Sequence, residues 1–296
     1  MLCGGRMVAY SSGLFQVTGT DEEGPFLLST LKTICKDNWE WRKQINHLAL
    51  FELKKRSRGA VLSWAWFLIK PAMYLFCFWF ALDVGLRVGS NAAGKPPYFL
   101  WLCAGNIPWF FMSDMINTGI DVMHRYPYLV NKIKFPLSGI STIYTSATML
   151  VQFMLQGALF IIYFLSGMHL DLYLLQVPLL LVLMWLYWNI FSILFSQLSA
   201  ISKDVKNLMQ AFSTPIFWLS GVIFNVRAIH IGWIQTILNF NPVTFFVTSF
   251  RCALYDKMWF WENTHLCIGF AVMFVVTLVL ALFSYKKLNE EVADVL

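Results

Sequence analysis

A short polar stripe inside a long apolar segment is the first feature of this sequence that could do chemistry. Asp114 lies within WFFMSDMINTGID, and Asn117 and Asp121 follow on the same face of a helix. A charge at the centre of a bilayer costs about 2.5–3.5 kcal/mol on insertion scales, so the stripe should face protein or water rather than lipid. Two roles are open for it: lining a conduit, or hydrogen bonding to a neighbouring helix.

Aromatic residues form the second candidate group. Their faces can stack on sugar rings, but they also fill membrane cores, and composition alone favours core packing. Those that gather away from the ends of apolar runs are Tyr74, Phe78, Trp79, Trp109, Phe110, Phe111 and Trp218.

The sequence contains none of the common motifs of enzymes. It has no G-x-x-x-x-G-K-[ST] loop to hold nucleotide phosphates, no H-E-x-x-H and no G-x-S-x-G. The five histidines are scattered, and the six cysteines show no C-x-x-C spacing. We therefore expect no catalytic residue, no metal site and no cofactor on this chain.

The composition places these residues in a membrane. Hydrophobic residues make up 58% of the chain and charged residues 13%, about half the charged fraction of a typical soluble domain. The net charge of +6 does not indicate nucleic-acid binding, because the basic residues lie in short clusters between apolar runs. We expect an integral membrane protein with no nucleic-acid partner.

Six apolar stretches are long enough to cross a bilayer, which takes about 20 helical residues. They are 60–83, 98–120, 138–165, 173–200, 207–226 and 263–285. A further stretch, 229–250, is interrupted by Asn239, Asn241 and Pro242 and is expected to form a re-entrant pair of short helices. Lys70, inside the first stretch, could extend toward the interface. The predicted fold class is an all-α integral membrane protein with six transmembrane helices.

The basic residues predict the orientation. Most of the 22 lysines and arginines lie before the first span, in the loops after the second and fourth, and in the tail. The positive-inside rule then places both termini in the cytoplasm. The polar segment 38–58 has one moderately apolar face, so we expect an interfacial helix, or else a cytosolic helix packed on a partner. The expected parts are a cytoplasmic segment 1–37, the interfacial helix 38–58 and a transmembrane domain 59–296.

Four sequence blocks resemble the permease subunits of type-2 ABC exporters for polysaccharides, most closely the teichoic-acid translocation permeases. The resemblance runs from about residue 40 to the end. The blocks are ELKKRSRGAVLSWAWFLIKP (52–71); PYFLWLCAGNIPWFF (97–111) with YLVNKIKFP (128–136); SAISKDVKNLMQAF (199–212) with WLSGVIF (218–224); and FNPVTFFVTSFRCALY (240–255) with the tail EEVADVL. The family commonly has Arg-Asp where this chain has Lys203-Asp204, so the same contact is not assumed there.

The resemblance implies a homodimer in the cell membrane, with six spans per copy and re-entrant extracellular helices between the fifth and sixth. Each copy would bind a separate ATPase subunit that carries the ATP and Mg. The substrate would be a polyprenyl-diphosphate-linked glycan.

The resemblance also implies roles for individual residues. Coupling to the ATPase would involve Asp121, His124, Arg125, Asn131, Lys132, Lys134, Phe135, Pro136, Lys203 and Asp204. Admission of the anionic head group would involve Arg42, Lys43, Lys54, Lys55, Arg56 and Arg58. The translocation pathway would include Tyr74, Phe78, Trp109, Phe111, Asp114 and Trp218, and the extracellular gate Asn241, Pro242 and Arg251. For Lys132 and Lys134, simple anchoring of the cytoplasmic loop is the alternative.

Three rival functions follow from the same residues. An O-antigen or capsule exporter would have nearly the same permease and differ in its glycan. A drug or small-lipid exporter would be expected to have shorter extracellular segments and fewer aromatics. An integral membrane acyl- or glycosyltransferase would need acidic residues or histidines clustered at an interface, and the sequence has no such cluster.

Overall fold

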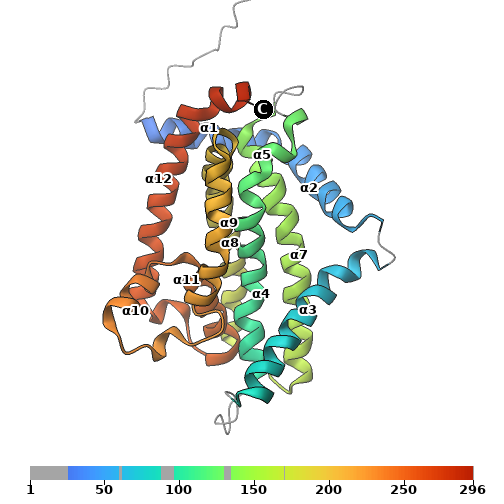
Figure 1. The fold of residues 1–296 in the computed structure, drawn as a ribbon, viewed down its shortest axis with the longest axis vertical. Helices are drawn as coiled ribbons and strands as arrows, with labels where there is room; N and C mark the ends of the chain where they lie inside the picture. Colours follow the sequence, from blue (N-terminus) through green and yellow to red (C-terminus); the bar gives the residue numbers. More distant parts are fainter. Residues whose placement is uncertain (1–25, 60–61, 88–96, 130–134, 170, 296) are drawn as a thin grey trace, which may run out of the picture.

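The described part of the chain is a bundle of helices, with α1, α2 and α3 along its outside (Figure 1). The computed structural model describes residues 26–59, 62–87, 97–129, 135–169 and 171–295. No strand occurs among these residues. Helix α1 (Phe26–Glu40) crosses one end of the bundle, the end at which α12 (Thr264–Val295) also finishes. The all-helical prediction is confirmed for this part of the chain.

Four helical segments are long and apolar enough to cross a membrane. They are Ser63–Gly85, Leu137–Leu165, Leu172–Ile201 and Thr264–Leu288. They consist of η1 (Ser63–Ala65), α3 (Trp66–Trp79) and η2 (Phe80–Gly85); α7 (Leu137–Leu165); η4 (Leu172–Leu175) and α8 (Gln176–Ile201); and most of α12. They agree with the first, third, fourth and sixth predicted spans to within a few residues.

Two further helices run beside these four, α4 (Tyr98–Asn117) and α9 (Lys203–Leu219). They match the second and fifth predicted spans in place, but they are more polar than the other four, so six crossings stay a prediction. Helix α9 ends seven residues before the predicted 226, because the chain turns at Ser220 and Gly221. Gly221 has a φ of 75°, a left-handed conformation that glycine adopts without strain.

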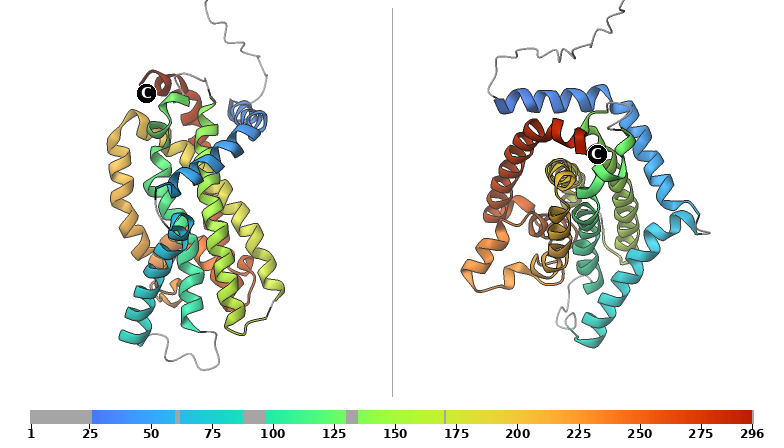
Figure 2. Two further views of the ribbon diagram at one scale, coloured as in Figure 1. Left: turned by 90° about the vertical axis from the view of Figure 1, so that its right-hand side faces the viewer. Right: turned by 45° about the horizontal axis from the view of Figure 1, so that its top comes forward.

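The segment predicted as one interfacial helix, 38–58, is divided between two helices. Helix α1 extends to Glu40, and α2 (Arg42–Ser57) follows after Trp41. The helices α1, α2 and α3 succeed one another along the outside of the bundle (Figure 2). Helix α2 packs against α7 through its buried residues, which include Ile45, Ala49 and Leu53.

Two short helices, α10 (Gly232–Asn239) and α11 (Pro242–Arg251), occupy the stretch predicted to be re-entrant. They lie at the end of the bundle opposite α1 (Figure 1). Whether they re-enter a membrane stays a prediction. The remaining short elements are η3 (Gly119–Asp121), α5 (Val122–Arg125), η5 (Val226–Ala228), η6 (Cys252–Asp256) and η7 (Phe260–Glu262).

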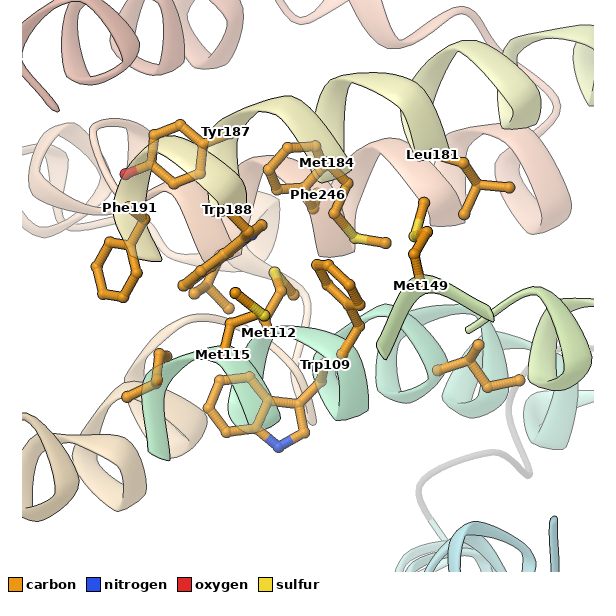
Figure 3. Packing of buried hydrophobic residues seen from close by; sticks show 14 of the residues in the cluster. Trp109, Met112, Met115, Met149, Leu181, Met184, Tyr187, Trp188, Phe191 and Phe246 are labelled. Atoms are coloured by element: carbon orange, nitrogen blue, oxygen red, sulfur yellow. The ribbon is translucent and has the colours of Figure 1, made fainter. Parts of the chain in front are cut away.

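The core lies between α4, α7, α8 and α11 (Figure 3). Met112 and Met115 of α4 are completely buried, as are Met184 of α8 and Phe246 of α11. These unbranched and aromatic side chains fill the space between helices that cross at different angles. The side chain of Trp109 points away from α8, on the other side of α4 (Figure 3). On that side, Trp109 lines a cavity.

Candidate functional site: a cavity beside helix α4

A cavity of about 710 Å³ lies between α3, α4, α7 and α9, with Arg56 of α2 in its wall. The structure brings together, in this one wall, all six residues that the sequence analysis assigned to a translocation pathway: Tyr74, Phe78, Trp109, Phe111, Asp114 and Trp218. They come from three helices that are far apart in the sequence.

One side of the cavity is aromatic, and Phe217 of α9 is at its centre. Its ring centroid lies 5.4 Å from that of Trp109, 5.6 Å from Phe78 and 6.1 Å from Tyr74. The contacts with Tyr74 and Phe78 are edge-to-face, an arrangement that aromatic quadrupoles favour. Trp218, beside Phe217, keeps 53% of its surface exposed. This wall offers flat apolar faces.

Another part of the wall is polar and centred on Asp114. Tyr144 donates a hydrogen bond to Asp114 Oδ2 at 3.0 Å, and Thr148 donates another at 3.0 Å. Arg56 Nη1 lies 3.2 Å from the same oxygen. Asp114 therefore lines the cavity and joins α4 to α7 and α2, so its bonding to neighbouring helices is observed, while a conduit at this position stays a prediction.

Arg56 turns inward from α2. Its guanidinium lies over the Tyr144 ring, 4.5 Å from the ring centroid, and its Nε is 3.6 Å from Glu52 Oε1. Burial alone would lower the pKa of Arg56, but the charge interactions with Tyr144, Asp114 and Glu52 outweigh it and raise the pKa. The guanidinium is therefore a permanent cation in the cavity wall.

The rest of the polar stripe joins α4 to α9. Asn117 donates to Ser213 Oγ at 2.8 Å. Asp121 pairs with Lys206 at 2.7 Å and lies 3.1 Å from His124 Nδ1. Asn117 and Asp121 thus bond to neighbouring elements, the second of the two roles predicted for the stripe.

The helices that line the cavity lie within the part of the chain that matches a known protein family. The model of the ABC-2 type transporter family matches residues 43–255, a stretch that contains every element lining the cavity. The chain belongs to the ABC-2 type transporter family. A comparison with curated proteins found no match. As an ABC-2 permease, the chain is a multi-pass membrane protein and the transport subunit of an ABC transporter, a family whose ATPase is a separate subunit.

The basic residues predicted to admit a head group fall into two sets in the permease. Arg56 faces the cavity. The other five are exposed along α2 or just after it: Arg42, Lys43, Lys54, Lys55 and Arg58. Only Arg56 is therefore placed to act inside the bundle.

Of the residues predicted to couple to the ATPase, those that the structure describes lie on elements at the end of the bundle where α1 lies (Figure 1). His124 and Arg125 of α5 are exposed, as are Lys203 and Asp204 at the start of α9. Ser202 caps α9 by accepting a hydrogen bond from the Asp204 backbone N–H at 3.3 Å. Asn131, Lys132 and Lys134 lie outside the described residues.

Phe135 and Pro136 directly precede α7. Pro136 precedes its first residue, Leu137. Phe135 is only 4% exposed, and its ring packs edge-on against Trp41 at 4.9 Å. Phe135 thus anchors α7 to the junction of α1 and α2 instead of offering its ring to a partner chain.

The predicted gate residues are structural in this conformation. Asn241 caps α11 by accepting a hydrogen bond from the Val243 N–H at 2.9 Å, and its amide donates to Ser220 Oγ at 2.7 Å. Pro242 is the first residue of α11, where its missing N–H removes no helical hydrogen bond.

Arg251 is a buried clamp. It is 4% exposed and donates to the carbonyls of Gly221 at 2.6 Å, Trp101 at 3.3 Å and Phe224 at 3.4 Å, and also to that of Val222. Gly105 leaves the space for it, because a side chain there would collide with the guanidinium. Arg251 therefore holds the turn after α9 against α4.

The contribution of α7 was not expected from the sequence. Tyr144 and Thr148 donate hydrogen bonds to Asp114, and Gln152 lines the same cavity. A signal was present: Thr148, Gln152 and Gln156 recur at intervals of four residues within an apolar run, which puts three polar side chains on one helical face.

Proposed function

We propose that this permease exports a polyprenyl-diphosphate-linked glycan, a teichoic-acid precursor being the best candidate, from the cytoplasm to the cell exterior. The observation that supports the proposal most is that the cavity is lined by both aromatic and charged residues. Its aromatic side suits the faces of sugar rings, and its cations Arg56 and Lys70 suit a diphosphate. An exporter of purely apolar molecules would have no use for these charges in its wall.

The proposed assembly is a homodimer with two copies of a separate ATPase subunit, and both termini of each permease in the cytoplasm. Of the four long apolar segments, Ser63–Gly85 is the least buried, with 6% of its most apolar window inside the protein. Trp218 and Leu219 of α9 are also exposed. A second copy facing α3 and α9 would extend the cavity into a channel.

In the proposed mechanism, exposed basic residues of α2 attract the head group and Arg56 receives it at the cavity. ATP binding closes the ATPase subunits, which press on α5 and the start of α9. The ion pair of Lys206 with Asp121 joins α9 to the last residue of η3, directly before α5, so α5 and the start of α9 would move together. This motion would open the cavity toward the second copy.

Depletion of the permease in its native cell should cause a lipid-linked glycan to accumulate, because synthesis continues while export stops. Mass spectrometry of the extracted lipid-linked fraction measures the amount and composition. Glycerol- or ribitol-phosphate units would identify a teichoic acid, and a phosphate-free repeat would identify an O-antigen or capsule. No accumulation of any lipid-linked glycan, in cells that recover when the gene is restored, would contradict the proposal.

A labelling experiment tests the proposed orientation. In a variant without native cysteines, His169→Cys, between α7 and η4, should react with an impermeant maleimide on intact cells, and Lys36→Cys only after permeabilisation. Both residues are exposed and lie outside the four long apolar segments, so access to the reagent decides the result. Labelling of Lys36→Cys on intact cells would show that the orientation is reversed.

A further inference from the structure

Gln152 of α7 stands out among the residues of the cavity wall. It lines the cavity but is only 1% exposed. Neither its amide nitrogen nor its amide oxygen has a hydrogen-bond partner among the described residues. A buried amide without partners destabilises a fold, and more so in a bilayer, where water cannot replace them. Such a group calls for a specific explanation, and a ligand in the cavity supplies one.

The charges near Gln152 indicate what kind of ligand fits. Arg56 and Lys70 are two cations in the wall, against the single carboxylate of Asp114. Asp114 is already bonded to Tyr144, Thr148 and Arg56. Glu52 lies 3.6 Å from Arg56 and balances a second positive charge, so Lys70, which forms no ion pair with a carboxylate of the described residues, is the cation left to attract an anionic group.

Gln152 lies one helical turn beyond Thr148, about 5.4 Å along α7. Thr148 also accepts a hydrogen bond from Arg56 Nη2 at 3.2 Å, so it marks the cationic end of the wall. A ligand with its phosphates at Arg56 would place the next chemical group beside Gln152. In a polyprenyl-diphosphate-linked glycan that group is the first sugar.

The chemistry of an amide distinguishes a sugar from the other parts of such a ligand. Glutamine offers two donor hydrogens and one acceptor oxygen. A sugar hydroxyl both donates and accepts, whereas a phosphate only accepts and a polyprenyl chain does neither. The aromatic rings of Tyr74 and Trp109 line the same cavity and offer faces for the sugar ring.

We infer that Gln152 is a specificity-determining residue, which hydrogen-bonds the first sugar of the lipid-linked substrate while Arg56 and Lys70 hold its diphosphate. The inference rests on the proposed function and adds to it the residue that recognises the first sugar.

The test uses the permease in complex with its ATPase, in lipid nanodiscs. ATP hydrolysis is measured against two probes, polyprenyl-diphosphate-linked N-acetylglucosamine and polyprenyl diphosphate alone. Gln152→Leu should raise the half-stimulating concentration of the glycosylated probe about tenfold, and leave that of polyprenyl diphosphate within about twofold of wild type. Leucine removes the unpaired amide, so this variant should fold at least as well as wild type.

Gln156→Leu is the matched control. Gln156 lies one turn further along α7, is 3% exposed and also has an unpartnered amide, but it does not line the cavity. It should leave the response to both probes unchanged. Equal responses of Gln152→Leu and wild type, or equal losses in the two variants, would overturn the inference.

Measurements on the wild-type complex distinguish failure of this inference from failure of the proposed function. Stimulation by polyprenyl diphosphate with no difference for the added sugar would overturn the inference and leave a lipid-linked substrate in place. No stimulation by either probe would overturn the proposed function, and the inference with it.

Discussion

Arg251→Met should lower the free energy of unfolding of the permease by about 4 kcal/mol or more. Arg251 donates hydrogen bonds to four backbone carbonyls in the interior. Methionine fills a similar volume but donates none, so these carbonyls would stay buried without partners. The guanidinium also lies 3.5 Å from the centroid of the Trp101 ring, a cation–π contact that methionine lacks. Thermal unfolding of the purified protein measures the loss, a shift of roughly 10 °C.

Arg227→Met is the matched control. Arg227 has 33% of its side chain exposed and pairs with Asp256 at 3.4 Å. Its other bonds go to the sulfur atoms of Cys252 and Met258, which are weak acceptors. The control should lose no more than about 1 kcal/mol. Equal shifts in the two variants would show that Arg251 is not a clamp.

Gly105→Ala tests the same clamp from the other side. The added methyl group would collide with the Arg251 guanidinium, so the single variant should unfold at a lower temperature than wild type. In the Arg251→Met background the same change should have a smaller effect, because the flexible methionine can move aside. If the decreases in unfolding temperature of the two single variants simply add in the double variant, Gly105 and the Arg251 side chain are not in direct contact.

Asp114→Ala should reduce export at least about tenfold, the equivalent of 1.4 kcal/mol, and lower stability by less than Arg251→Met does. The change leaves Arg56 without its partner in the cavity wall and removes the acceptor for Tyr144 and Thr148. Since 32% of the Asp114 side chain is exposed, water compensates part of the lost stability. We expect a loss of about 1–2 kcal/mol. Export in a depleted strain and thermal unfolding give the two numbers.

Two variants separate charge from hydrogen bonding at this position. Asp114→Asn keeps an acceptor for Tyr144 and Thr148 but loses the ion pair with Arg56. It should be nearly as stable as wild type while exporting poorly. Arg56→Met combined with Asp114→Leu removes both charges of this pair but leaves the buried carboxylate of Glu52 without Arg56, so it should be less stable than Asp114→Ala. Normal export by Asp114→Ala would remove this ion pair from the mechanism.

The hydropathy of the chain was enough to locate its most apolar helices. The spans predicted at 138–165 and 173–200 match Leu137–Leu165 and Leu172–Ile201 closely. The free energy of inserting a helix into a bilayer depends mainly on the apolar residues of that helix. A long apolar run therefore identifies a membrane-crossing helix without knowledge of its neighbours. The end of α9 was missed because one glycine turn, at Gly221, interrupts a run that is still apolar.

The sequence by itself determined the class of molecule, the absence of a phosphate-binding loop and the aromatic and acidic residues worth following. Only the tertiary structure decided which partners they have. Asp114 meets Arg56 from 58 residues away and Thr148 from 34 residues away. Phe135, assigned to ATPase coupling, packs inward against Trp41, and Arg251, assigned to the extracellular gate, is buried and clamps a turn. A sequence pattern shows that a buried polar group needs a partner, but the partner is chosen by packing between helices that are distant in the chain.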